Sequence, residues 1–287
     1  SSKSTIDNCN FTGNHAKYSG GAIDCNASEM YLTNTVFDAN YAQFGAALCR
    51  EVNAIGGHGG NNTFTNNHAY VSGAALGWMG SVNITIINYT FINNTADVSG
   101  GAIYVSEDSH NCSIINSRFE NNYVTNESQS GEFSWEAWDG TTITYSVSVD
   151  TTQDPEKLNK TIMYNQNTIH WFFGTFPSDV LGVGGAINIL ASNATITKSN
   201  FTNNTARLGG GFYVGADSGN TKVEGSIFSS NIAYERGGAI NLHASATHIE
   251  ESEFYDNEAI DGGAVYVGGV GTNNNIHNSI FQRNKAS

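Results

Sequence analysis

Basic residues are scarce in this 287-residue chain. It has 12 Lys and Arg against 26 Asp and Glu, which gives a formal net charge of −14 and a pI of about 4.8. Nucleic-acid-binding proteins need a basic surface to neutralise phosphates, and docking on anionic lipids needs one too. Both kinds of function are therefore disfavoured, and we expect no nucleic-acid partner.

Helix-forming residues and long apolar runs are also lacking. Leu, Lys and Glu are few, whereas Asn, Gly, Ser and Thr are abundant, which favours short strands and frequent turns over long helices. No stretch is long and apolar enough for a transmembrane span, and the sequence opens without a signal peptide or an initiator Met. It starts and stops within a repeat. We expect a monomeric piece of a longer protein, with no direct membrane insertion.

The four cysteines, Cys9, Cys25, Cys49 and Cys112, have no C-x-x-C spacing, so a zinc site is not expected. The first three fall in the first repeats. They are consistent either with a disulfide in an oxidising compartment or with small buried hydrophobic side chains. We predict no metal and no cofactor.

One sequence unit recurs nine times. It reads Phe, two residues, Asn, and then Gly-Gly-Ala-Ile, as in FINNTADVSGGAI from Phe91. A fixed period in this range is the signature of a solenoid. The anchoring phenylalanines are 26–28 residues apart, except for one gap of 82 residues, and they are Phe11, Phe37, Phe64, Phe91, Phe119, Phe201, Phe228, Phe254 and Phe281.

Each repeat contains residues of alternating polarity. Apolar and polar or tyrosine positions alternate after the Gly-Gly pair, as in Ile103-Tyr104-Val105, which predicts a strand with one face in a core. Another apolar column, which includes Ile114, lies five residues before each Phe, and a bend must separate the two. Three short strands and three corners fit one coil. The predicted fold is all-β, a right-handed parallel β-helix of about nine coils of ~27 residues, formed by residues 1–122 and 184–287.

Stacked coils place like residues directly above one another. The Phe column is therefore expected to form an aromatic stack in the core, and the Asn column a hydrogen-bonded ladder at a turn. The structural ladders are predicted to include Phe91, Phe119, Phe201, Phe228 and Phe254, with Asn94, Asn122, Asn204, Asn231 and Asn257.

The long gap marks an insertion at 123–183, which we expect to be an aromatic-rich, β-rich subdomain or long loop. A clean alternating strand runs over 142–149. Insertions in solenoids lie on one face, often the binding face. The aromatic side chains are expected either to form the insertion's own small core or to be exposed as a binding surface. The tentative binding residues are Trp135, Trp138, Trp171, Phe172 and Phe173.

The pair of motifs F-x-x-N and G-G-A-[ILV] resembles the repeat of the chlamydial polymorphic outer-membrane proteins and of the adhesin-like surface proteins of methanogenic archaea. The Asn- and Thr-rich composition of the repeats, as in INNTADVSGGAIYV over 92–105, is more similar to the archaeal proteins. Two repeats depart from the pattern, because Ala46 and Ala74 replace the second Gly and because Arg50 and Trp78 occupy a core-facing column. We expect local irregularity there.

The resemblance implies an extracellular, cell-surface β-helix that attaches to another cell or to a matrix. Its partner would be a surface protein or a glycan of another cell, with the coils as stalk and the insertion as contact surface. A structural surface spacer without a ligand is an alternative. Twelve N-x-[ST] sequons, among them Asn83, Asn88 and Asn93, are expected to be glycosylated in part in a surface protein, although an Asn- and Thr-rich repeat also produces sequons by chance.

A carbohydrate-active β-helix enzyme, a glycosidase or lyase, is the other alternative. Glu224, Glu250 and His277 share a column, and two carboxyl groups about 5 Å apart would suit a retaining glycosidase. An exposed polar ladder explains the same column more simply, since acid pairs are common on surfaces. We expect no enzyme.

Overall fold

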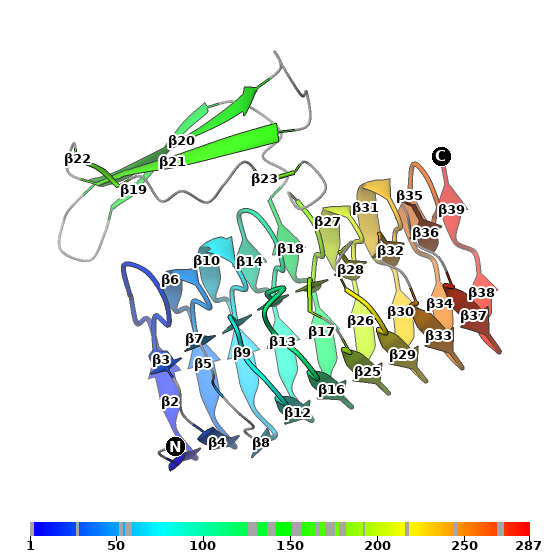
Figure 1. The fold of residues 1–287 in the computed structure, drawn as a ribbon, viewed down its shortest axis with the longest axis horizontal. Coiled ribbons are helices and arrows are strands. Elements are labelled where there is room, and N and C mark those ends of the chain that lie inside the picture. Colours follow the sequence, from blue (N-terminus) through cyan, green and yellow to red (C-terminus); the bar gives the residue numbers. More distant parts are fainter. Residues whose placement is uncertain are drawn as a thin grey trace. The chain divides into compact units, whose positions relative to one another are not determined.

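The computed structural model describes 3–26, 29–51, 54, 59–125, 182–191, 193–215, 218–243, 246–268 and 273–287, together with the strand backbones at 131–136, 142–150, 157–164, 167–169 and 176–177. By its internal contacts the chain divides into two compact units, residues 1–125 with 182–287 and residues 126–181. The first unit is a right-handed parallel β-helix (Figure 1) and confirms the predicted fold class.

Each coil passes through four parallel sheets in the order A, B, C and D. Sheets A and B have nine strands each, and sheets C and D have eight, so the number of turns is close to the predicted nine. Sheet A contains β1 (Lys3–Asp7), β4 (Glu29–Thr33), β8 (Gly59–Gly60), β12 (Thr85–Ile87), β16 (Ser113–Ile115), β25 (Thr195–Thr197), β29 (Lys222–Glu224), β33 (His248–Glu250) and β37 (Asn275–His277). Sheet B carries the Phe column and contains β2 (Asn10–Thr12), β5 (Val36–Asp38), β9 (Thr63–Thr65), β13 (Thr90–Ile92), β17 (Arg118–Glu120), β26 (Asn200–Thr202), β30 (Ile227–Ser229), β34 (Glu253–Tyr255) and β38 (Ile280–Gln282).

The other two sheets complete the coil. Sheet C follows the Asn column and contains β6 (Tyr41–Phe44), β10 (His68–Ser72), β14 (Thr95–Ala96), β18 (Tyr123–Val124), β27 (Thr205–Leu208), β31 (Ile232–Arg236), β35 (Glu258–Ala259) and β39 (Lys285–Ala286). Sheet D follows the Gly-Gly pair and contains β3 (Ile23–Asn26), β7 (Leu48–Glu51), β11 (Leu76–Trp78), β15 (Ile103–Val105), β24 (Ile187–Ile189), β28 (Phe212–Val214), β32 (Ile240–Leu242) and β36 (Val265–Val267).

Sheet C corrects the expectation of three strands per coil. Some of its strands, such as β14, have only two residues, which is too short for an alternating pattern to be visible in the sequence. The bend expected before the Phe strand is present, and it uses the left-handed backbone of residues such as Asn116, with φ 48°, and Asn278, with φ 48°. Asn tolerates this conformation better than most residues do, which accounts for the abundance of Asn at the corners.

The core is a single apolar column inside the four sheets. Most inward side chains of sheets A, B and D are buried and belong to one continuous cluster, and Ile114, Phe119 and Ile187 are at most 1% exposed. Ala46 and Ala74, which replace the second Gly, are buried in a small alanine cluster beside sheet C. The pairing of β10 with β6 shifts in register after Ala69, but β27 and β31 show a similar shift in a coil that keeps the Gly-Gly pair. The irregularity is therefore not specific to the alanine coils.

The second unit is β-rich, as predicted for the insertion. Its strands pair antiparallel in the order β19 (Gly131–Glu136), β20 (Thr142–Asp150), β21 (Lys157–Tyr164) and β22 (Asn167–Ile169), and β23 (Phe176–Pro177) pairs with β21.

Candidate functional site

The Phe column forms an unbroken stack through the solenoid. Neighbouring ring centroids are 4.6–5.2 Å apart, and the rings are within 17° of parallel, from Phe11 to Phe281. The rings from Phe37 to Phe254 are completely buried. Their role is to hold adjacent coils together, because a partner molecule has no access to them.

The Asn column is equally continuous, and its inner members use their whole hydrogen-bonding capacity. In the coil of β26, Asn204 Nδ2 donates to Phe119 O at 3.1 Å and to Asn231 Oδ1 at 2.9 Å. Asn204 Oδ1 accepts from the backbone N and from Nδ2 of Asn122, both at 3.0 Å. Two donors and two acceptor sites are all that an amide offers, so the buried side chain is fully satisfied.

Both ladders continue across the insertion. Phe119 and Phe201 are separated by 82 residues, yet their rings stack at 4.8 Å and their strands β17 and β26 pair in register. Tyr123 pairs with Thr205, and Val183 bridges to Ser99 and Leu208. The solenoid therefore keeps its geometry where the 126–181 unit leaves and returns.

The aromatic binding candidates belong to this inserted unit. The backbone of Trp135 lies in β19, opposite Ile143 of β20. Trp138, Trp171, Phe172 and Phe173, and the side chain of Trp135, lie outside the described residues. Their proposed contact role stays a prediction.

The acidic column of sheet A is a surface ladder. Glu224 pairs with Glu250 and Glu250 with His277 in adjacent strands. Lys222 Nζ lies 3.0 Å from a Glu224 oxygen and 3.8 Å from a Glu250 oxygen, and the three side chains are 38–39% exposed. Hydrogen bonding to Glu224 raises the pKa of Lys222, so the lysine stays charged and offsets one of the two negative charges. An ion-paired, partly exposed column of this kind is common on protein surfaces and does not by itself indicate an acid and nucleophile pair.

Many of the sequons have their Asn at exposed corners. Their backbone is left-handed, with φ between 53° and 59°, and the side chains are directed away from the core columns. A glycan attached there would meet no buried atoms. These corner sequons are Asn61, Asn83, Asn88, Asn93, Asn111, Asn193 and Asn203.

Three potential metal ligands come close together among the described residues. Ligand atoms of Asp24, Cys49 and Glu51 lie within 4.8 Å of one another. Burial, assisted by the two acids, raises the pKa of the Cys49 thiol well above its usual value. A cysteine that binds a metal does so as the thiolate, so these surroundings disfavour it as a ligand.

The cysteines are all free thiols in this structure, and three of them are buried. Burial also raises the pKa of Cys112 to about 12. We expect a thiol-specific reagent at neutral pH to label only the partly exposed Cys9 in the folded protein, whereas Cys25, Cys49 and Cys112 react on unfolding. Mass spectrometry of the labelled peptides checks this, and early labelling of Cys49 or Cys112 would contradict it.

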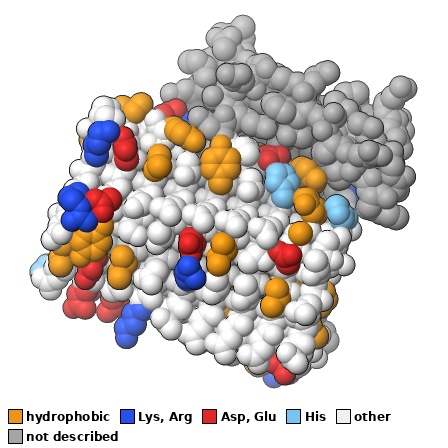
Figure 2. Space-filling view, turned by 180° about the vertical axis from the view of Figure 1, so that it is seen from behind, with side chains coloured by type: hydrophobic (Ala, Val, Ile, Leu, Met, Phe, Trp, Pro, Cys, Tyr) orange, Lys and Arg blue, Asp and Glu red, His pale blue; other side chains and the backbone are white. Residues whose placement is uncertain are grey.

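The face of the solenoid seen in Figure 2 is of mixed charge. Acidic and basic side chains lie beside each other in small groups, and hydrophobic side chains are scattered among wide areas of other side-chain and backbone atoms. Several ion pairs join adjacent coils, including Arg283 with Asp256 and Lys285 with Glu258. Among the residues that the structure describes, no helix has the length and apolar character needed to cross a membrane.

Comparison with known proteins identifies the repeat but not a relative. Two segments, residues 8–26 and 88–106, match the Chlamydia polymorphic membrane protein repeat. Both segments run from the turn before a Phe strand, through the Asn column and the Gly-Gly pair, into sheet D. No curated protein and no solved structure matches the chain significantly. The chain thus contains repeats of the type found in chlamydial polymorphic membrane proteins, and they build a parallel β-helix.

Proposed function

We propose that this chain is part of an extracellular cell-surface adhesin. The coils act as a stiff stalk, and the 126–181 unit provides the contact surface for a surface protein or glycan of another cell. The Asn- and Thr-rich repeats favour the adhesin-like surface proteins of methanogenic archaea as the closer parallel, with glycans on corner sequons such as Asn88 and Asn93.

One observation carries this proposal. The solenoid contains an inserted compact unit whose strands pair antiparallel, whereas the strands of the coils pair parallel. The register of the coils on either side of this unit does not change. Such an arrangement supports a division of labour, in which the repeats provide length and stiffness and the insertion provides specificity. The match to a repeat of polymorphic membrane proteins supports the surface location.

We propose no catalytic activity. Glu224 and Glu250 lie side by side on a partly exposed sheet, where Lys222 forms ion pairs with both carboxylates. The structural-spacer alternative differs from the adhesin only in lacking a ligand, so binding experiments decide between them.

The deciding experiment compares the chain with a variant that lacks the insertion. Val124 is equivalent to Ala96 and Val183 to Ser99 in the preceding coil, where only Asp97 and Val98 lie between. Replacing residues 125–182 by Asp-Val should therefore close the solenoid with its native connection. Both proteins are tested for binding to a glycan array and to a panel of intact cells, and circular dichroism confirms that each keeps its β structure.

We expect binding by the complete chain and at least a tenfold loss in the deletion variant. A Trp138→Ala variant is expected to weaken binding without changing the melting temperature, as for an exposed aromatic anchor. Equal binding by the deletion variant would move the contact site to the coils, and no binding by either protein would favour the spacer.

A further inference from the structure

An arginine lies inside the otherwise apolar core. Leu48 and Arg50 of β7 both point inward, and Arg50 is only 5% exposed. It pairs in register with Cys25 on one side and Trp78 on the other. The same position holds Val105, Ile189 and Val214 in later coils, so the charge is specific to this part of the solenoid.

The guanidinium of Arg50 is incompletely paired among the residues that the structure describes. It hydrogen-bonds the Cys25 thiol, but its Nε and Nη2 atoms are buried and have no hydrogen-bond partner within the described part of the chain. The titratable groups that act on it most are Cys25, Tyr89 and Cys112, and no carboxylate is among them. No ion pair among the described residues includes Arg50. A buried cation without an anion is strongly unfavourable, so its retention needs an explanation.

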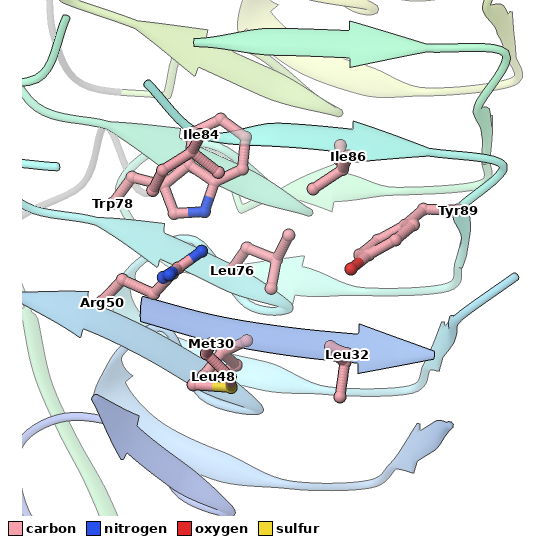
Figure 3. Close-up of a pocket in the computed structure, with 9 residues that line it drawn as sticks. All are labelled: Met30, Leu32, Leu48, Arg50, Leu76, Trp78, Ile84, Ile86 and Tyr89. Atoms are coloured by element: carbon pink, nitrogen blue, oxygen red, sulfur yellow. The ribbon is translucent and has the colours of Figure 1, made fainter. Parts of the chain in front are cut away.

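A cavity adjoins this side chain. The volume of this cavity is about 20 Å³. Figure 3 shows the guanidinium of Arg50 and the hydroxyl of Tyr89 directed into the interior from opposite sides. Burial raises the pKa of Tyr89 to about 12, so the hydroxyl stays protonated and can donate a hydrogen bond. Apart from the two polar groups and the indole of Trp78, the lining is aliphatic or thioether: Met30, Leu32, Leu48, Leu76, Ile84 and Ile86.

We propose that this cavity binds a single monatomic anion of the size of chloride, held by Arg50. About 10–15 Å³ is the minimum for one water molecule, so the cavity takes one small species and excludes phosphate, sulfate and carboxylate metabolites. Water would fill the space but leave the positive charge uncompensated. An anion accepts from the free N–H groups and neutralises the charge in a low-dielectric surrounding, where the attraction is strongest.

Thermal unfolding in chloride tests the proposal. Sodium chloride is exchanged for sodium gluconate at constant ionic strength, because gluconate is too large for the cavity. A ligand that binds only the folded state raises its stability by RT ln(1 + [L]/Kd), which corresponds to about 3–6 °C in Tm for each tenfold increase in chloride above Kd. We expect this rise in the wild-type protein and in Arg118→Met, a control in which an exposed arginine is lost.

Arg50→Met is the informative variant, because it keeps much of the side-chain volume and removes the charge. We expect it to fold and to lose the chloride dependence, since an apolar residue suits this column in the other coils. A chloride response equal in wild type and Arg50→Met would overturn the proposal.

Diffraction from wild-type crystals grown in sodium bromide provides a test that does not depend on the variant folding. An anomalous peak within hydrogen-bond distance of Arg50 Nη2 is expected. A water molecule alone in the cavity under these conditions would overturn the proposal.

Discussion

Replacing Asn204 by aspartate is expected to lower the free energy of unfolding by about 3–5 kcal/mol. The two side chains have nearly the same shape, but the carboxylate has no N–H group to donate to Phe119 O and Asn231 Oδ1. It instead places a negative charge beside two acceptor oxygens at a fully buried position. The loss is large because two hydrogen bonds become repulsive contacts, and Asn231 Oδ1 keeps only the hydrogen bond from the backbone N of residue 204.

The penalty should depend on pH with a predictable sign. Burial raises the pKa of a carboxyl group, so the folded Asn204→Asp protein binds a proton at a higher pH than its unfolded chain does. Its stability relative to wild type is therefore lowest at neutral pH, and it recovers as the pH falls toward the unfolded value of about 4. Urea unfolding of both proteins between neutral and acidic pH measures this difference.

Asn203→Asp is the matched control, since Asn203 is adjacent, exposed and in the left-handed conformation that aspartate also tolerates. We expect its stability to stay within about 0.5 kcal/mol of wild type. Equal effects of the two substitutions would mean that the Asn ladder contributes no more than an ordinary surface turn.

The spacing of a few residue types was sufficient to predict the solenoid. Phe119 and Phe201 are in contact although 82 residues separate them, and their contact follows from their places in the repeat. Because the coils stack in parallel, residues that are one repeat apart in the sequence become neighbours in space. A column in an alignment of the coils is therefore a ladder in the structure. For the same reason the pairing of Glu224 with Glu250 was predictable.

Features that do not repeat were harder to predict. The cross-coil contact of Lys222 with Glu250 depends on side-chain reach rather than on register. Some strands of sheet C, such as β14, are too short to show a period. Arg50 was recognisable as a departure in a core column, but its unpaired atoms and the adjoining cavity depend on packing around Trp78 and Tyr89. The insertion lies outside the 27-residue repeat, so its contacts do not follow from the period, and its aromatic residues were consistent with a core and with a binding surface.

The second large effect is expected for Gly237→Ala, at the first glycine of a Gly-Gly pair. Gly237 has φ 68°, and a Cβ atom there would lie 2.3 Å from Ile240 O of the same turn. The clash lies within one coil, so a change in the spacing between coils does not relieve it. Left-handed strain and the close contact together should cost about 2–4 kcal/mol. Urea unfolding measures the loss.

Gly219→Ala provides the control, because Gly219 lacks a left-handed backbone and a Cβ atom there meets no other atom within 4 Å. We expect no loss of stability, or a small gain through the lower entropy of the unfolded chain.

The second position of the Gly-Gly pair behaves differently. A Cβ at Gly238 would lie 2.1 Å from Gly263 O of the next coil, yet Ala46 and Ala74 occupy the equivalent position elsewhere. Contacts between coils are thus adjustable through small changes in stacking, whereas the turn at the first glycine is not. This explains why all eight described pairs keep their first glycine (Gly20, Gly45, Gly73, Gly100, Gly184, Gly209, Gly237 and Gly262) while two lose their second. A Gly238→Ala variant less stable than Gly237→Ala would contradict this order.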